Sequence, residues 1–78
     1  MASVYAVEAH ITKQLATGTK RESFIDAIHA TMEGAEAAVR REVNGFLEAG
    51  AKQLACNVVE LNETETWSFV IHAFHLEN

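Results

Sequence analysis

Proline is absent from this chain of 78 residues, and cysteine, tryptophan and tyrosine occur only once each. The single cysteine, Cys56, excludes a disulfide within the chain. A classical zinc site needs clustered cysteine and histidine, whereas the four histidines here are scattered. Because a chain of this length forms one domain, here residues 1–78, with a core too small to be very stable alone, we expect it to associate with copies of itself.

Positive charge is also scarce, since 6 Lys and Arg stand against 11 Asp and Glu, for a net charge of -5. Nucleic-acid binding needs a basic patch, so no nucleic-acid partner is expected. No stretch approaches the roughly 20 apolar residues of a membrane span, and "MASVYAVEAH" has no basic leader of a signal peptide. With one free cysteine and no export signal, the sequence predicts a cytoplasmic protein without a membrane partner.

Residues 4–12 alternate between two sets and predict a half-buried strand. One set comprises Tyr5, Val7, Ala9 and Ile11; the other comprises Val4, Ala6, Glu8, His10 and Thr12. The segment "KQLATGT" then predicts a connection with Gly18 as its flexible point.

Residues 19–49 predict one long helix. "TKRE" at 19–22 matches a capping box, and Gly50 suits the position after the last turn. Such a helix would have about 30 residues and a length of about 45 Å. Apolar residues follow in steps of three and four, namely Phe24, Ile28, Met32, Ala35, Val39, Val43 and Phe46.

Two further strands are predicted at residues 53–61 and 67–76, joined by the polar turn "NETET". The expected fold class is therefore α+β, in the order β-α-β-β. The strand at 67–76 is expected in the middle of a three-stranded antiparallel sheet, with the helix across one face.

The strand at 67–76, "WSFVIHAFHL", is apolar on both faces, although one face of a small sheet should meet water. Exposing Val70, Phe74 and Leu76 together would leave a patch that monomers rarely tolerate. We therefore predict an oligomer interface formed by Val70, His72, Phe74 and Leu76, covered by another copy of the chain.

Small residues occupy the other side of the predicted helix. They are Ala27, Ala30, Gly34, Ala38, Gly45 and Ala49. Either they mark a second contact between subunits, centred on Ala30, Gly34 and Ala38, or alanine simply serves as an exposed helix former. The two glycines favour the contact, because helix propensity does not explain them.

Candidate chemistry is sparse. His10 and His72 could share the second sheet face and bind a metal, sense pH, or hydrogen-bond within an interface, and the last is the commonest case. Glu36 near His29 could act in acid–base chemistry, but a solvated ion pair with Arg40 is the simpler reading. Cys56 is more simply a small buried residue than a nucleophile, so no catalytic or metal-ligating residue is assigned.

The chain resembles the dodecins, small β-α-β-β proteins that form hollow spheres and bind flavins. The resemblance lies in "VY" at the start, "ESFIDAI" and "FVIHAFHLE", together about a quarter of the chain. It implies the strand order and assembly. The flavin-stacking tryptophan of that family falls early in its second strand, where this chain has "AKQLACN", so no ligand residue is carried over.

The sequence thus predicts a non-enzymatic, homo-oligomeric binding or interaction protein with an unknown partner. The alternative is a dodecin-like carrier of a flavin or another planar small molecule, with the cofactor itself unknown. Because ligand pockets usually need about 300 Å³ or more, we expect any ligand site to lie between subunits, near Trp67 and the second face of the strand at 67–76.

Overall fold

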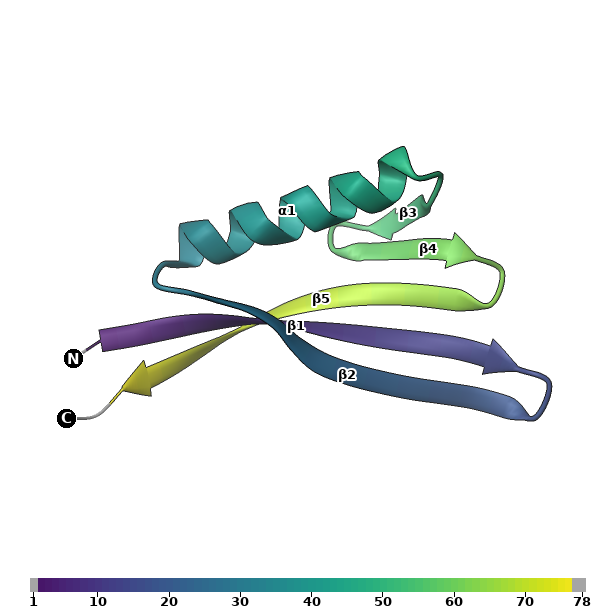
Figure 1. Ribbon diagram of the computed structural model, residues 1–78, viewed down its shortest axis with the longest axis horizontal. Helices are drawn as coiled ribbons and strands as arrows, with labels where there is room; N and C mark the ends of the chain where they lie inside the picture. The colour runs from purple at the N-terminus through teal and green to yellow at the C-terminus, as the bar shows by residue number, and fades with distance from the viewer. Residues whose placement is uncertain (1, 77–78) are drawn as a thin grey trace.

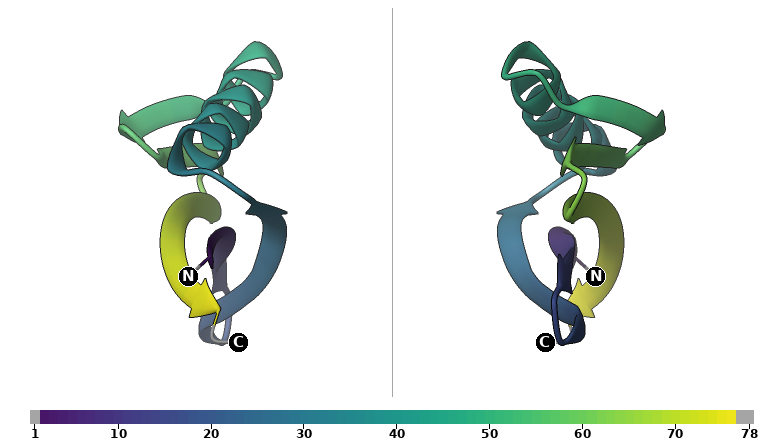
Figure 2. Two further views of the ribbon diagram at one scale, coloured as in Figure 1. Left: turned by 90° about the vertical axis from the view of Figure 1, so that its left-hand side faces the viewer. Right: turned by 90° about the vertical axis from the view of Figure 1, so that its right-hand side faces the viewer.

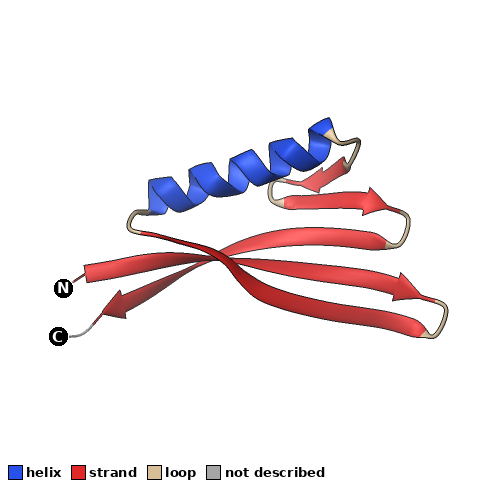
Figure 3. Cartoon of the chain, in the orientation of Figure 1, coloured by secondary structure: helices blue, strands red, loops and turns tan. Residues whose placement is uncertain are grey.

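The computed structural model describes residues 2–76 as one antiparallel sheet with a single helix on one side (Figures 1 and 3). The elements in chain order are β1 (Ala2–Leu15), β2 (Gly18–His29), α1 (Met32–Glu48), β3 (Lys52–Ala55), β4 (Val58–Asn62) and β5 (Glu65–Leu76). Their order across the sheet is β2-β1-β5-β4-β3. No helix in this part of the chain is long and apolar enough to cross a membrane.

The sheet has five strands and most of the described residues lie in it, so the predicted α+β fold, a β-α-β-β order with three strands, is wrong. One part of that prediction is nevertheless confirmed. The strand at the end of the chain, β5, lies between β1 and β4 and is antiparallel to both. The predicted strand at 53–61 is divided by a turn at Cys56 and Asn57 into β3 and β4.

The largest error concerns residues 18–29, which form the edge strand β2 and not the first half of a long helix. A bulge opposite Val7 and Glu8 inserts Asp26 into β2. The bulge lengthens the strand period from two to three, so Ile25 and Ile28 lie on the same face of the sheet. A step of three also occurs on one face of a helix, so spacing alone does not distinguish this bulged strand from a helix. Phe24 and Ile28, which share one side of the predicted helix, lie on opposite faces of the sheet.

The helix α1 is accordingly short, with 17 residues. Its N-cap is Thr31, and the Thr31 hydroxyl accepts a hydrogen bond from the Gly34 amide at 3.0 Å. The predicted capping box is therefore wrong, and the Thr19 hydroxyl instead donates to Gln14 across the β1–β2 hairpin. The predicted end is confirmed, since α1 stops at Glu48 and Gly50 follows with a positive φ of 103°.

The core lies between α1 and the sheet and consists mainly of small residues. The helix contributes Ala35, Val39 and Val43, which are spaced one turn apart. The sheet contributes Val7 and Ala9 of β1, Val59 of β4 and Phe69 of β5. The predicted inward set of β1 is thus confirmed, because Ile11 is also buried and Tyr5 packs against this cluster.

The sheet extends beyond the helix and is strongly curved. Principal extents of 48 × 28 × 15 Å describe an elongated molecule. Seen from its ends, β2 and β5 bow outward on either side of β1, with α1 above them (Figure 2). The face of the sheet that points away from α1, called here the outer face, therefore has no covering element within the described residues.

Two threonine substitutions test where the helix begins. Thr31→Ala is expected to lower the free energy of unfolding by about 1 kcal/mol, because it removes the N-cap acceptor. Thr19→Ala should change it by less than about 0.5 kcal/mol, because Thr19 lies in an exposed strand end. Urea denaturation followed by circular dichroism measures both. A larger loss for Thr19→Ala than for Thr31→Ala would contradict this helix boundary.

Candidate functional site

The outer face carries a cluster of large, exposed apolar side chains. Register with β1 places all of them on that face. Exposed fractions are 50% for Ile25, 65% for Ile28, 41% for Val70, 51% for Phe74 and 46% for Leu76. We call these five residues the outer patch. Sequence analysis named the three from β5 but missed Ile25 and Ile28, because residues 18–29 were assigned to a helix.

A charged cluster lies within the outer patch, because Glu8 pairs with Ile25 of β2 on one side and with Val70 of β5 on the other. The Glu8 carboxylate oxygen Oε1 lies 2.6 Å from Nε2 of His10 and 3.6 Å from Nε2 of His72. Both histidines share the outer face, as predicted, because β1 pairs with β5. The described residues contain no group of three or more His, Cys, Asp or Glu able to hold a metal ion. Both histidines thus contact the same carboxylate, and their part in an interface stays a prediction.

The small residues predicted as a helix contact do not share one helical face. Ala30 lies in the bend before α1 and is exposed. Gly34 lies in the first turn, where an added Cβ would be 3.1 Å from the Thr31 hydroxyl and 3.5 Å from Nδ1 of His29. Ala38 is half-buried and faces a groove beside β2. A contact between subunits through these residues stays a prediction.

That groove has a volume of about 400 Å³ and lies between α1 and β2. Its lining residues are Asp26, Ala27 and His29 from β2, and Ala38, Arg41 and Glu42 from α1. We call it the acid groove. A single chain therefore supplies an open groove of the size that ligand pockets usually need, while the expected position of a ligand site between subunits stays a prediction.

The acid groove places two carboxyl groups against each other. Burial, a side-chain hydrogen bond with Asp26 and the charge of Asp26 together raise the pKa of Glu42 to about 7, and burial is the largest of the three causes. Glu42 therefore holds a proton up to neutral pH. Oε2 of Glu42 and Nε2 of His29 are buried without a hydrogen-bond partner in the described structure. Such groups are uncommon in folded proteins and require an explanation.

A second groove of about 370 Å³ follows along the same side of α1. It is lined by Glu42, Gly45, Phe46 and Ala49, and we call it the apolar groove. Glu42 belongs to both grooves. The small residues Ala38, Gly45 and Ala49 leave space beside the helix for the two grooves. The sequence analysis explained these small residues only as a contact between helices or as exposed helix formers.

Trp67 lies on the face of β5 that points toward α1, opposite to the outer patch. Its ring centroid is 5.1 Å from that of Phe46 and 6.0 Å from that of Phe24, the latter in an edge-to-face arrangement. Trp67 therefore packs within an aromatic cluster. Because Phe46 lines the apolar groove, Trp67 lies next to that groove. The outer patch is on the opposite face of the sheet.

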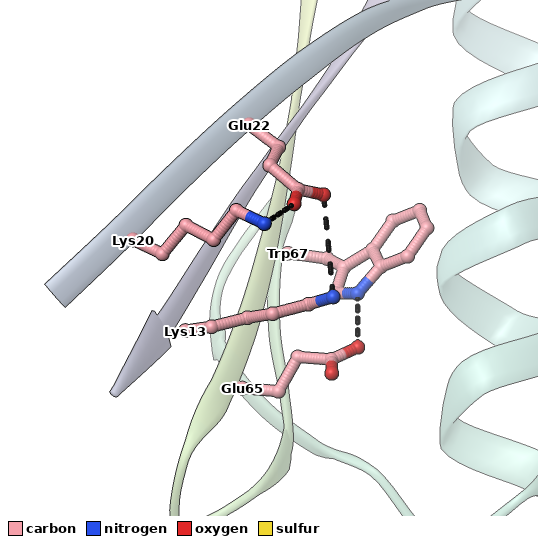
Figure 4. A network of polar contacts seen from close by, with 5 residues as sticks. All are labelled: Lys13, Lys20, Glu22, Glu65 and Trp67. Carbon is pink, nitrogen blue, oxygen red and sulfur yellow. Dashed lines mark hydrogen bonds and ion pairs between the residues drawn. The ribbon is translucent and has the colours of Figure 1, made fainter. Parts of the chain in front are cut away.

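The indole N–H of Trp67 takes part in a hydrogen bond, and a group of ion pairs lies close to it (Figure 4). Nε1 of Trp67 donates to the Glu65 carboxylate at 2.8 Å. Beside it, Glu22 pairs with Lys20 at 3.0 Å and with Lys13 at 4.0 Å. The hydrogen bond from Lys20, together with the Lys13 charge, lowers the pKa of Glu22. The two ion pairs of Glu22 are exposed on the surface of the β1–β2 hairpin, and they do not form a cavity.

The remaining candidates from the sequence lie elsewhere. Cys56 is exposed in the turn between β3 and β4, so its predicted burial is wrong. Its carbonyl oxygen accepts a hydrogen bond from Gln53. Glu36 and Arg40 line a small hollow of about 170 Å³ near Cys56, on the side of α1 away from the acid groove. The structure therefore does not bring Glu36 and His29 into one site.

Sequence analysis missed the acid pair altogether. Asp26 and Glu42 are 16 positions apart, and the long predicted helix placed both on one element. Only the return of α1 over β2 brings them together. The sequence holds one weak indication of this pair. An aspartate inside an apolar strand is unusual, and Asp26 is the extra residue of the bulge.

The raised pKa of Glu42 predicts a pH-dependent effect of Glu42→Gln. The folded protein keeps this proton up to about pH 7, whereas the ordinary glutamic acid value is 4.5. Wild-type stability therefore falls as pH rises between these values. Glu42→Gln cannot ionise, so at pH 8 it should be more stable than wild type by on the order of 1 kcal/mol, and at pH 5 nearly equal to it.

Urea denaturation at the two pH values measures this difference. Glu36→Gln is the matched control, because Glu36 is exposed on the same helix outside the acid groove. An equal change in stability for Glu42→Gln at pH 5 and pH 8 would rule out the protonated carboxyl.

Comparisons with protein-family models, with curated proteins and with solved structures find no match to this chain. The resemblance to the dodecins therefore stays a prediction, although the three-stranded topology that it implied is replaced by five strands. The outer patch and the two grooves beside α1 are the features from which function has to be argued.

Proposed function

We propose that the protein is a non-enzymatic, homo-oligomeric binding protein whose subunits meet through the outer patch. The observation that carries this proposal is the exposure of five large apolar side chains on one sheet face, from β2 and β5. Contiguous apolar surface of a few hundred Å² on a small protein usually marks an interaction site.

The composition of the core supports self-association. Within residues 2–76, nine hydrophobic residues are buried, and three of them are alanines, so six larger side chains remain: Val7, Ile11, Val39, Val43, Val59 and Phe69. Nine large hydrophobic residues of the same range are exposed. At roughly 25 cal/mol per Å², covering a patch of a few hundred Å² contributes several kcal/mol per subunit. A small domain buries a smaller fraction of its surface on folding than a large domain does, so the apolar area buried in an interface is a larger share of its total stabilisation.

A second copy of the chain is the occupant that fits the apolar side chains of the outer patch, whereas nucleic acid would need a basic surface that a chain with a net charge of -5 does not favour. Glu8 lies between Ile25 and Val70 of the outer patch, but His10 and His72 contact it. Two copies related by a twofold axis can therefore bring their apolar residues together without placing two unpaired carboxylates in the interface.

His10 and His72 lie on the outer face, His29 lies beside α1, and Cys56 is exposed in a distant turn. The proposal keeps the protein a binding protein because Cys56, its single thiol, does not lie with any of these histidines. An exposed, unpaired cysteine is compatible with a reducing compartment, so we place the protein in the cytoplasm as part of this proposal.

Substitution of Val70 by aspartate tests the interface. Light scattering of wild type at micromolar concentration should give a multiple of 8.6 kDa, and Val70→Asp should reduce the mass, because an unpaired carboxylate within an apolar interface is costly. Leu15→Asp is the matched control, since Leu15 is an equally exposed apolar residue at the hairpin end of β1 and outside the outer patch.

A wild-type monomer at these concentrations would refute the proposal. A mass that is unchanged by Val70→Asp but reduced by Ala38→Glu would move the interface to the side of α1 that borders β2. Circular dichroism of each variant separates dissociation from unfolding.

A further inference from the structure

We propose that protonation controls assembly through the outer patch: two copies of the chain associate tightly when each Glu8 carboxylate is neutralised by a proton held on His10 or His72, and they separate as the pH rises above neutral. This inference rests on the proposed function, because it concerns the same surface. It adds that the interface takes up protons as it forms.

A carboxylate lies inside the outer patch. Glu8 of β1 is opposite Ile25 of β2 on one side and opposite Val70 of β5 on the other. Its side chain keeps 26% of its surface accessible, so a second copy that covers Ile25 and Val70 also covers Glu8. An ionised carboxylate that loses its water is strongly unfavourable unless a cation and hydrogen bonds accompany it. The interface therefore needs a positive charge beside each Glu8.

Histidine supplies that charge. Oε1 of Glu8 lies 2.6 Å from Nε2 of His10 and 3.6 Å from Nε2 of His72, and within residues 2–76 these are its ion-pair partners. A neutral imidazole can donate a hydrogen bond to the carboxylate but leaves its negative charge in place. Histidine is also the side chain whose ordinary charge change falls between pH 5 and 8. Neutralisation of Glu8 is therefore available below neutral pH and is lost above it.

The other neighbours of the cluster carry no charge. His10 is opposite Ser23 of β2 and Ser68 of β5, and His72 is opposite Ala6 of β1. Asp26 belongs to the helix side of the sheet, where it lines the acid groove.

Three further charged residues of the described outer face lie closer to the hairpin end of the sheet. They are Arg21 of β2, Glu60 of β4 and Lys52 of β3, all at the level of Thr12. Thr12 is about 13 Å from Glu8 along β1, which exceeds the screening length of about 8 Å at physiological ionic strength. Arg21, the one beside β1, is exposed to water. The charge of Glu8 therefore depends on the two histidines.

The sign of the pH effect follows from proton uptake. In a free subunit water stabilises Glu8, so a charged histidine contributes little. In the assembled state the charged histidine is required, so each subunit takes up about one proton on association above neutral pH. The dissociation constant then rises with pH. Two protons per dimer set an upper limit of about a hundredfold per pH unit, and an increase of at least about tenfold is expected from pH 6.5 to pH 8.5.

Sedimentation of the wild-type chain over a range of concentrations, at pH 6.5 and at pH 8.5, measures this dissociation constant. EDTA in every sample removes any metal ion that could bridge the histidines of two copies. Association should be at least about tenfold tighter at pH 6.5.

Variants of the cluster identify the group that responds. Glu8→Gln keeps the shape of the side chain without its charge, so at pH 8.5 it should associate at least about tenfold more tightly than wild type and lose the preference for low pH. This is a gain of assembly, which an unfolded variant cannot mimic in circular dichroism. The double variant His10→Gln, His72→Gln should associate weakly at both pH values, because Glu8 then has no cation.

His75→Gln is the matched control. His75 is an exposed histidine of the same strand as His72, on the face opposite the outer patch, where its Nδ1 lies 3.0 Å from the Ser3 hydroxyl. This variant should keep the pH dependence of the wild type. A wild-type monomer at both pH values would overturn this inference together with the proposed function. A wild-type oligomer with equal dissociation constants at both pH values, or a Glu8→Gln variant that keeps the wild-type pH dependence, would overturn this inference alone.

Discussion

The pairing of β1 with β5 is the constraint on which the rest of this structure depends. Twelve residue pairs join the two strands, from Ala2 with Leu76 to Lys13 with Glu65. Side chains alternate strictly along a strand, so a shift of one residue would move every one to the opposite face. The observed register places Ala9 opposite Phe69 beneath α1 and Val4 opposite Phe74 on the outer face.

This register also separates the two faces of the sheet. Residues of β5 that face α1, such as Trp67 and Phe69, complete a core with the helix. The alternate residues, such as Val70 and Phe74, have no helix to cover them. A single helix of 17 residues cannot cover both faces of a five-stranded sheet, so an apolar outer face follows from the number of elements as well as from the sequence.

The bulge at Asp26 sets which side chains the edge strand β2 places on each face of the sheet. An extra residue in one strand bends it and increases its local twist. Here the extra residue is the carboxylate that meets Glu42 of α1. The same bulge places Ile25 and Ile28 together on the outer face. One local irregularity therefore contributes to both the acid groove and the outer patch, and bulges commonly re-aim side chains in this way next to functional sites.

Local patterns sufficed for the segments with an unambiguous period and for the residues at their ends. The alternation in β1, the antiparallel pairing of β5 between two strands, the end of α1 before Gly50 and the apolar character of both faces of β5 could all be predicted from the sequence. Residues 18–29 could not be assigned in this way, because a bulged strand and a helix can both place apolar residues three positions apart on one face. The acid groove likewise depended on tertiary structure, since Asp26 and Glu42 meet only after α1 folds back over β2, and no local pattern encodes that contact.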